Sequence, residues 1–329
     1  MKNKINIIIP VYNAFAFLGE CLDCIRNQSG KDWICYLVND GSTDNSQLII
    51  DEYCSLDDRF VGMSKPNEGS PAKTIRYALK HIDSGFVTAI GDDDFVSADF
   101  VEKLMSRQRE TEADIVVPHM CCYKDDVSSI LWTKPDDLFD FEQVVDGKTA
   151  CLLTLPDWII GMNGALIRKE LLDSTAEGEW SYSDELQERE MLVQCKRVAF
   201  TDAKYYYRFN PGSITKSVSP FAFEKSIIEA QLVEFAKKNY PDNKSLIQEL
   251  SYKHFSGLQS NIVRFETLKN RFSVEQCQRI EKVMAYSYEL TDISEVFKRS
   301  LKWGLAVLLL RRFEWYQAFV IKHFKKKEL

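Results

Sequence analysis

Short apolar runs alternate with helix-like stretches over the first hundred residues. The apolar runs are continuous rather than alternating, which is typical of parallel strands that are covered by helices on both faces. They are INIIIPV, WICYLVND, RFVGMSK and GFVTAIGDDD, and the stretches between them predict helices at 15–27, 46–55 and 72–82. This β-α-β order predicts an α/β fold with a mostly parallel sheet flanked by helices.

The pattern changes in the second half of the chain. It predicts a helix at 100–111, a strand in ADIVVPHM and a helix that carries DELQEREMLVQCK. From about residue 221 the chain reads as helical to its end, with alternating apolar and charged faces. We therefore expect an α/β domain at 1–215 and a helical C-terminal region at 216–329 that ends in a basic amphipathic segment.

Polar residues follow each of the four strands predicted in the first hundred residues. In an open α/β sheet, ligands bind beyond the carboxyl ends of the strands. The sequence therefore predicts one site where four loops meet. The loop residues are Pro10, Tyr12 and Asn13, then Asp40 to Asp44, then Asn67, Gly69 and Ser70, then Asp92 to Asp94.

The strongest local signal is Asp92-Asp93-Asp94, directly after the apolar run 86–90. Adjacent carboxylates repel one another, and a bound divalent cation would offset that repulsion. Mg²⁺ or Mn²⁺ held there would bridge the two phosphates of a nucleoside diphosphate. A solvated acidic loop or a helix N-cap would explain the same residues, so the motif alone does not decide between these interpretations.

Two other acidic positions are candidates for chemistry. Asp40, at a strand end in VNDGSTDNS, could accept hydrogen bonds from a nucleobase or ribose, while Gly41 permits the tight turn. Asp184, at the start of a predicted helix, could take a proton from an attacking hydroxyl. A plain strand-turn-helix connection and a simple helix cap are the ordinary alternatives for these two positions.

Taken in order, these segments resemble the inverting family 2 glycosyltransferases, which share the GT-A fold. The segments span roughly residues 5–215 and are IIIPVYN, VNDGSTDNS, NEG, GDDDF, SDE and YYYRFNPGSIT. The resemblance implies a GT-A-like fold and transfer of a sugar, with inversion, from a nucleotide-sugar to an acceptor hydroxyl. It also implies UDP as the nucleotide and a glycan or lipid-linked acceptor, in the synthesis of bacterial surface polysaccharide.

The resemblance also implies roles for individual residues. Asp184 matches the catalytic base, and Asp92 to Asp94 match the DXD-type metal motif, with Asp92 and Asp94 as the expected ligands of Mn²⁺ or Mg²⁺. Trp158 matches the segment before the acceptor-side helix. Nucleotide-binding positions are matched by Pro10, Tyr12 and Asp40, and we expect Asn13, Asn67, Lys73, Asp92 and Asp93 to bind the same nucleotide.

Several segments depart from the family pattern. The family commonly has Asp-Ser-Asp-Asp where this chain has Gly91 before its three aspartates, and ARNxG where this chain has AKTIRYA. Ser183-Asp184 stands where Glu-Asp is common, which leaves Glu185 as an alternative base. The QxxRW motif of processive members is echoed at 194–197, but Val198 replaces the Trp. We therefore expect a non-processive enzyme.

Charge is distributed unevenly along the chain. The formal net charge is −7, which disfavours a general nucleic-acid binder. Basic residues are concentrated from Lys298 to the end of the chain. The longest uncharged run in this stretch is far shorter than the ~20 apolar residues needed to span a bilayer. An amphipathic helix with Trp303, Phe313, Trp315 and Phe319 on one side would lie on an anionic membrane surface. A terminal helix packed on the protein is the alternative.

The nine cysteines are scattered and the chain begins with a strand-like segment. We expect a reducing, cytoplasmic location, with peripheral attachment to the inner face of the cell membrane. Cys21 and Cys24 fall in a predicted amphipathic helix, and Cys121 and Cys122 in a strand, so neither pair is assigned any chemistry.

Two other classes of protein compete with the transferase interpretation. A sugar nucleotidyltransferase would carry a Gly-rich loop with Arg and Lys after its first strand, and the segment 10–13 is not such a loop. A catalytically inactive, transferase-like scaffold at the membrane would not need Asp40, the three aspartates at 92–94 or Asp184, all of which are present.

Overall fold

The protein is described by a computed structural model that covers residues 4–124, 126, 128–156, 158–175, 178–209 and 219–325. The chain divides into two compact units. The first, which we call the sheet unit, contains residues 1–177 and 187–210, and the second, the helical unit, contains residues 178–186 and 211–329. The domain boundary predicted at residue 215 lies outside the described residues and stays a prediction.

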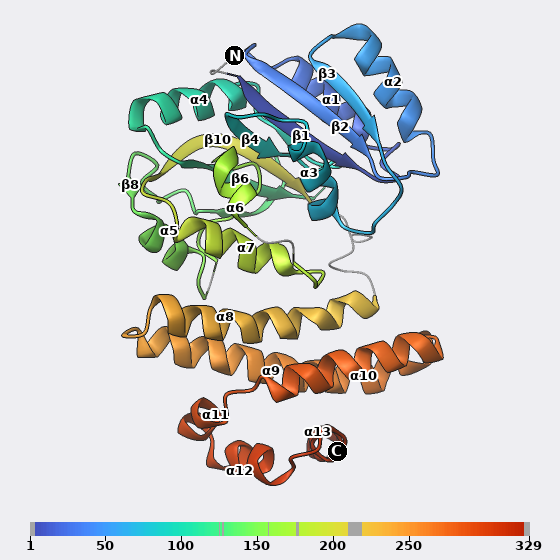
Figure 1. Ribbon diagram of the computed structural model, residues 1–329, viewed down its shortest axis with the longest axis vertical. Helices are drawn as coiled ribbons and strands as arrows, with labels where there is room; N and C mark the ends of the chain where they lie inside the picture. The colour runs from blue at the N-terminus through green and yellow to red at the C-terminus, as the bar shows by residue number, and fades with distance from the viewer. Residues whose placement is uncertain are drawn as a thin grey trace. The chain divides into compact units, whose positions relative to one another are not determined.

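Over the described residues, the sheet unit is built on one ten-stranded sheet (Figure 1). Its first four strands are parallel and lie in the spatial order β3-β2-β1-β4. They are β1 (Ile5–Val11), β2 (Trp33–Asn39), β3 (Phe60–Ser64) and β4 (Phe86–Ala89). The predicted strands are therefore confirmed, and the continuous apolar runs correctly predicted a parallel arrangement.

The sheet continues beyond β4 in the order β9-β6-β10-β5. Because β9 (Leu166–Arg168) is antiparallel to both β4 and β6, the strand β6 (Ile115–Tyr123) runs in the same direction as β4. The strand β10 (Val198–Arg208) is parallel to β6. The carboxyl ends of β1 to β4, β6 and β10 therefore share one edge of the sheet, which we call the carboxyl edge. The short strands β5 (Phe95–Val96), β7 (Ile130–Lys134) and β8 (Val144–Val145) complete the sheet.

Helices cover both faces of the sheet (Figure 1). Ile7 and Ile9 of β1 pack into a core with α1, α2 and α4, whereas Ile8 packs on the other face with α3 and α6. This two-sided burial explains why the strand has no polar alternation. The helices of this unit are α1 (Leu18–Arg26), α2 (Ser46–Leu56), α3 (Pro71–Leu79), α4 (Phe100–Thr111), α5 (Gly147–Leu153) and α6 (Lys169–Ser174), and α7 (Ser183–Leu192) ends in it.

The helical unit has a core of aromatic and aliphatic side chains. Tyr288 stacks on Tyr316 with 4.6 Å between ring centroids, and the ring of Tyr316 also contacts Phe255 in the same core cluster. The helices are α8 (Lys225–Asn239), α9 (Lys244–Leu268), α10 (Val274–Glu289), α11 (Ile293–Arg299), α12 (Leu301–Leu309) and α13 (Phe313–Lys325), with short 3₁₀ turns η1 (Pro220–Glu224) and η2 (Lys269–Arg271). The predicted helical C-terminal extension is confirmed.

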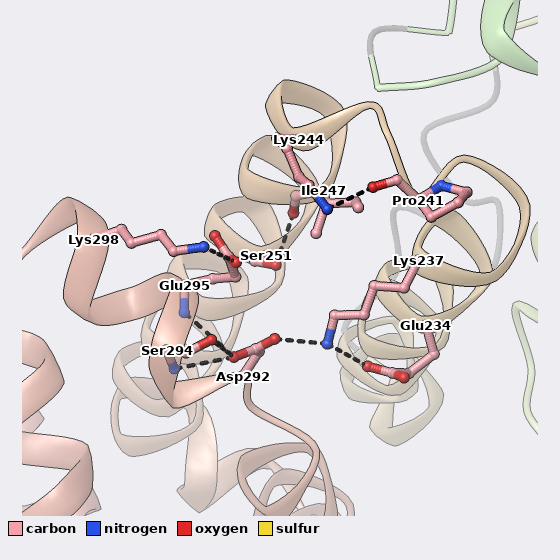
Figure 2. A network of polar contacts seen from close by, with 10 residues as sticks. All are labelled: Glu234, Lys237, Pro241, Lys244, Ile247, Ser251, Asp292, Ser294, Glu295 and Lys298. Atoms are coloured by element: carbon pink, nitrogen blue, oxygen red, sulfur yellow. Dashed lines mark hydrogen bonds and ion pairs between the residues drawn. The ribbon is translucent and has the colours of Figure 1, made fainter.

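A polar network links α8 to the start of α11 (Figure 2). Lys237 Nζ lies 2.6 Å from Asp292 Oδ2 and 2.7 Å from Glu234 Oε1. Asp292 is the N-cap of α11, and its Oδ1 accepts hydrogen bonds from the backbone N–H groups of Ser294 and Glu295. Burial alone would raise the pKa of Asp292, but these donors outweigh it and hold the pKa at about 2.

The end of the chain differs from the single amphipathic helix that we considered. Helix α12 ends at Leu309 and α13 begins at Phe313, and Trp303, Phe313 and Phe319 pack into the core of the helical unit. The four aromatic residues therefore do not form one exposed face, because three of them fill the unit's own core and Trp315 is exposed. Among the described residues, no helix combines the length and the apolar character needed to cross a bilayer.

Candidate active site

A buried ion pair lies where β2 and β3 end. Asp40 follows β2 and is 5% exposed, and its Oδ1 accepts a hydrogen bond from Lys65 Nζ at 2.5 Å. Lys65 also contacts the carboxylate of Glu68 at 2.9 Å. Burial by itself would lower the pKa of Lys65, but its hydrogen bonds to Asp40 and Glu68 outweigh this and raise it. Lys65 was not among the predicted site residues, although its position directly after an apolar strand could have indicated it.

The loop after β1 contacts the loops after both neighbouring strands. Asn13 has a φ of 53°, and its side-chain Oδ1 accepts a hydrogen bond from the N–H of Thr43 at 2.8 Å. The backbone N–H of Tyr12 donates to Asp92 Oδ2 at 3.0 Å, while the ring of Tyr12 is 49% exposed. Pro10 is the penultimate residue of β1. The structure thus brings together three of the four predicted loops.

The fourth loop approaches because Gly41 has no side chain. Gly41 has a φ of +69°, and a Cβ there would lie 2.9 Å from the backbone nitrogen of Asn67. Asn67 in turn accepts a hydrogen bond from the N–H of Gly69 at 2.6 Å. Lys73 lies half-buried in the first turn of α3, and Arg76 on the same helix donates to the carbonyl of Thr175.

We call residues 91–94 the acidic loop. Asp94 is 4% exposed, and its two carboxylate oxygens accept hydrogen bonds from the Tyr205 hydroxyl at 2.6 Å and the Arg208 N–H at 2.8 Å. Burial, together with repulsion from Asp93, raises the pKa of Asp94 to about 7, and the same two causes raise the pKa of Asp92 to about 7. Both carboxyl groups therefore lie in surroundings that disfavour their negative charge.

The end of β10 holds the acidic loop in place. The Tyr205 hydroxyl accepts the N–H of Gly91 at 3.1 Å, and the Arg208 guanidinium donates to the Asp93 carbonyl at 2.8 Å. Arg208 also donates to the carboxylate of Glu20. The sequence analysis assigned no role to these β10 residues, although they lie in the YYYRF segment that contributed to the family resemblance.

The acidic loop fits a metal that is shared with a ligand. Among the residues that the structure describes, no cluster of three or more His, Cys, Asp or Glu side chains is arranged to hold a metal ion by itself. Mg²⁺ is usually held by one or two carboxylates and takes further ligands from substrate phosphates. Asp92 and Asp94 match that need, because a cation would stabilise the charged form that burial and repulsion disfavour.

Asp184 belongs to the helical unit, whereas the predicted nucleotide-binding residues belong to the sheet unit. It lies in the first turn of α7, after a segment that is fixed by Glu224. Glu224 is 1% exposed, and its Oε2 accepts hydrogen bonds from the N–H of Ser181 at 2.9 Å and the hydroxyl of Ser181 at 2.8 Å. The other oxygen of Glu224 contacts Arg279 at 2.5 Å.

Solved structures share this fold. A crystal structure of S. aureus TarS 1-349 in complex with UDP-GlcNAc matches with a TM-score of 0.66 at 17% sequence identity, covering 98% of this chain and 92% of that one. A mannosyltransferase from Pyrobaculum calidifontis, in complex with GDP-Man and Mn²⁺, matches with a TM-score of 0.52 at 13% identity, covering 98% and 86% of the two chains. These similarities confirm the predicted GT-A-like fold.

Sequence comparison identifies the family. Glycosyltransferase GlyG from Streptococcus pneumoniae serotype 4 is 27% identical over 256 residues, which cover 72% of this chain and 80% of GlyG. Glycosyltransferase GlyA from the same organism is 28% identical over 229 residues, which cover 66% of this chain and 32% of GlyA. Residues 6–173, just over half of the chain, match the profile of "Glycosyl transferase family 2". The chain therefore belongs to glycosyltransferase family 2.

Proposed function

We propose that the protein transfers a sugar from a nucleotide-sugar to an acceptor hydroxyl with inversion, and that UDP is the nucleotide. The observation that carries the proposal is the acidic loop, where Asp92 accepts the N–H of Tyr12 in the loop after β1, which in turn contacts the loop after β2 at the same edge of the sheet. Ligands of open α/β sheets bind at this edge. The UDP-GlcNAc of the TarS complex and the GDP-Man of the mannosyltransferase complex support a nucleotide-sugar donor.

The loops after β1, β2 and β3 would bind the nucleotide. Lys65 orients the Asp40 carboxylate through Oδ1, so that Oδ2 can accept a hydrogen bond from the base or ribose. The exposed ring of Tyr12 offers a surface on which a base can stack. The remaining residues that we assign to the nucleotide site are Pro10, Asn13, Asn67, Lys73, Asp92 and Asp93.

Asp92 and Asp94 would hold the divalent cation, Mn²⁺ or Mg²⁺. When bound, the cation supplies Lewis-acid stabilisation of the diphosphate leaving group. Tyr205 and Arg208 orient the Asp94 carboxylate, Arg208 also donates to the loop backbone, and the N–H of Tyr12 donates to the Asp92 carboxylate.

Asp184 would act as the base. The acceptor oxygen forms a bond to the anomeric carbon as the bond from that carbon to the diphosphate oxygen breaks, and Asp184 takes the hydroxyl proton. The nucleoside diphosphate leaves, and one displacement inverts the configuration. Glu224 positions the segment before Asp184 through its two hydrogen bonds with Ser181.

We assign the acceptor to a glycan or lipid-linked glycan of bacterial surface polysaccharide, and the protein to the cytoplasmic face of the membrane. Exposed leucines at 301, 305 and 308 lie on one face of α12, and exposed Arg311 and Arg312 follow them. Such a face suits an anionic lipid surface. The test is binding of the wild type, of Leu305→Ser/Leu308→Ser and of the control Leu48→Ser on α2 to phosphatidylglycerol vesicles. Binding that is lost only in the α12 double variant would support membrane attachment through this face. Equal binding by all three proteins would show that this face of α12 does not bind the membrane.

The test of the transferase function is release of nucleoside diphosphate from a panel of sugar nucleotides, with Mn²⁺, with Mg²⁺ and with a chelator. The wild type is compared with Asp92→Asn, Asp94→Asn and Asp184→Asn. Asp83→Asn is the matched control, because Asp83 is exposed and precedes β4, whereas the acidic loop follows it. Metal-dependent release that is lost in the three site variants alone supports the proposal. No release from any donor would favour the scaffold alternative.

A further inference from the structure

Three aromatic side chains form a cluster at the carboxyl edge of the sheet unit. Trp132 lies on β7, Tyr207 lies on β10, and Trp158 lies in the segment between α5 and β9. The ring centroid of Trp132 is 5.8 Å from that of Trp158 and 6.2 Å from that of Tyr207. We call these three residues the aromatic platform. Tyr207 directly precedes Arg208, whose N–H donates to Asp94, so the Tyr207 end of the platform lies beside the acidic loop.

Trp158 is held in an unusual backbone conformation and is still open to solvent. Its φ is 53°, in the left-handed region that bulky residues rarely adopt. A Cβ at Gly161 would lie 2.5 Å from Met120 Cε and 3.3 Å from Trp158 Cζ2, so the segment is tightly packed behind the ring. The side chain is nevertheless 37% exposed. Backbone strain of this kind concentrates at ligand sites, and the exposed ring is accessible to a ligand.

The order of the strands places the platform with respect to the donor. Asp40 follows β2, Tyr12 follows β1, and the acidic loop follows β4, while the platform belongs to the β6, β7 and β10 side of the sheet. Neighbouring strands lie about 4.8 Å apart. In the order of the strands, β6 and β10 therefore lie beyond β4, on the side away from β1 and β2, and the acidic loop crosses towards them because β5, which follows it, pairs with β10. A donor that spans from Asp40 to the acidic loop would point its sugar towards the platform.

We propose that the aromatic platform binds a pyranose ring of the acceptor, with Trp158 as the main contact. The face of an aromatic ring is electronegative, and the C–H groups on one face of a pyranose carry partial positive charge, so the two surfaces stack. The donor is already held through its diphosphate, whereas an uncharged acceptor sugar needs a binding surface of its own. This inference rests on the proposed transferase function, since it takes the acceptor to be a sugar.

The direct test is saturation-transfer NMR of the full chain with the methyl β-pyranosides of glucose, N-acetylglucosamine, galactose and mannose. We expect at least one glycoside to bind the wild type and Trp158→Ala to bind it about tenfold more weakly. Trp158→Phe keeps a ring and should retain most of the binding. Ile159→Ala is the matched control, because Ile159 is the exposed apolar neighbour of Trp158, and it should bind as the wild type does.

Two outcomes of the NMR experiment would overturn the proposal. One is that none of the four glycosides binds the wild type. The other is that Trp158→Ala binds as well as the wild type, which would make the ring a packing element alone.

A second measurement separates this inference from the proposed function. Release of nucleoside diphosphate to water, without acceptor, is measured in the wild type, in Trp158→Ala and in the control Ile159→Ala, and thermal melts show that both variants are folded. Loss of that release in Trp158→Ala alone would place the ring at the donor and overturn the inference. If the wild type releases nothing from any donor, the proposed function fails; glycoside binding that depends on Trp158 would then still support a sugar-binding platform.

Discussion

The carboxylates of the acidic loop and two carboxylates of the helical unit, Glu224 and Asp292, are held by partners of different charge. In the acidic loop, the donors to Asp92 and Asp94 are neutral: two backbone N–H groups and the Tyr205 hydroxyl. In the helical unit, Glu224 contacts Arg279 and Asp292 contacts Lys237. The pKa values follow this difference, because the pKa of Asp292 is held at about 2, whereas those of Asp92 and Asp94 are raised to about 7.

The comparison separates carboxylates that stabilise the fold from those that are kept for a ligand. A carboxylate paired with a protein cation contributes to the free energy of folding, and its removal costs stability. A carboxylate that is buried with neutral donors and beside other carboxylates reduces stability unless a cation arrives from outside. Perturbed carboxyl groups of this second kind are concentrated at functional sites. Four substitutions test this distinction.

The largest expected effect is on activity, in Asp92→Asn. We expect release of nucleoside diphosphate to fall about a hundredfold or more, since the proposed metal site would lose a carboxylate. The melting temperature should rise, because the amide oxygen can still accept the N–H of Tyr12 and the repulsion with Asp93 is removed.

The gain in thermal stability of Asp92→Asn over the wild type should depend on pH. The pKa of Asp92 is raised in the folded protein from about 3.8 to about 7, so ionisation costs stability as the pH rises through that window. The advantage of Asp92→Asn in thermal melts should therefore be absent near pH 4, grow towards pH 7 and stay constant above it. A variant that is less stable than the wild type at pH 8 would contradict the comparison.

The largest expected loss of stability is in Lys65→Met. The side chains of Lys65 and Asp40 are 4% and 7% exposed, so the substitution leaves a buried carboxylate without its cation. We expect a loss of about 3–5 kcal/mol in the free energy of unfolding, measured by urea denaturation. The double variant Lys65→Met/Asp40→Leu should recover most of that loss, and additive losses in the double variant would argue against a coupled pair.

Glu224→Gln should have an intermediate effect. One amide oxygen can still accept from Ser181, but the amide nitrogen faces Arg279, and we expect a loss of about 2 kcal/mol. Turnover should also fall, with nucleotide affinity unchanged, because Asp184 follows the segment that Glu224 fixes. Glu234→Gln, at an exposed glutamate of the same unit, is the control and should cost less than about 0.5 kcal/mol. An equal loss in the free energy of unfolding in both variants would show that Glu224 stabilises the fold no more than an exposed glutamate does.

The smallest expected effect is in Asp292→Asn. Loss of the contact with Lys237 and weakening of the N-cap of α11 should cost about 1 kcal/mol near pH 7. The pKa of Asp292 is depressed in the folded protein, so its contribution is present above about pH 4 and is lost as the pH falls towards 2. The stability curves of wild type and variant should converge over that window. A constant difference down to pH 2 would show that the charge of Asp292 is not responsible.

The sequence predicted the first half of the sheet well, because strands covered on both faces are apolar throughout. Strands β1 to β4 and helices α1 to α4 begin and end close to the predicted positions. It missed β9, which has three residues, and β10, where a register shift between Phe200 and Lys204 interrupts the pattern. Periodicity cannot reveal elements that are so short or irregular.

The loops of the candidate site could be predicted from the sequence, but the residues that hold these loops in place could not. The polar residues after each strand could be found because parallel strands end at one edge. The partners Lys65, Tyr205 and Arg208 could not be predicted, because their roles depend on contacts between segments that are distant in sequence. Propensity likewise could not show that Trp303 and Phe319 fill the core of the helical unit, because burial of an aromatic side chain depends on which helices pack around it.

Backbone pairing between the two halves of the sheet passes through β9, which pairs at two positions with β4 and at two with β6. The family profile ends shortly after β9, at residue 173. In the part of the chain that the structure describes, four residue pairs thus join the two halves through β9. Under the proposed function, changes in β6, β7 and β10 would alter which acceptors bind, while β1 to β4 keep the nucleotide. Exchange of residues 115–208 between relatives would then be a practical route to new acceptor specificity.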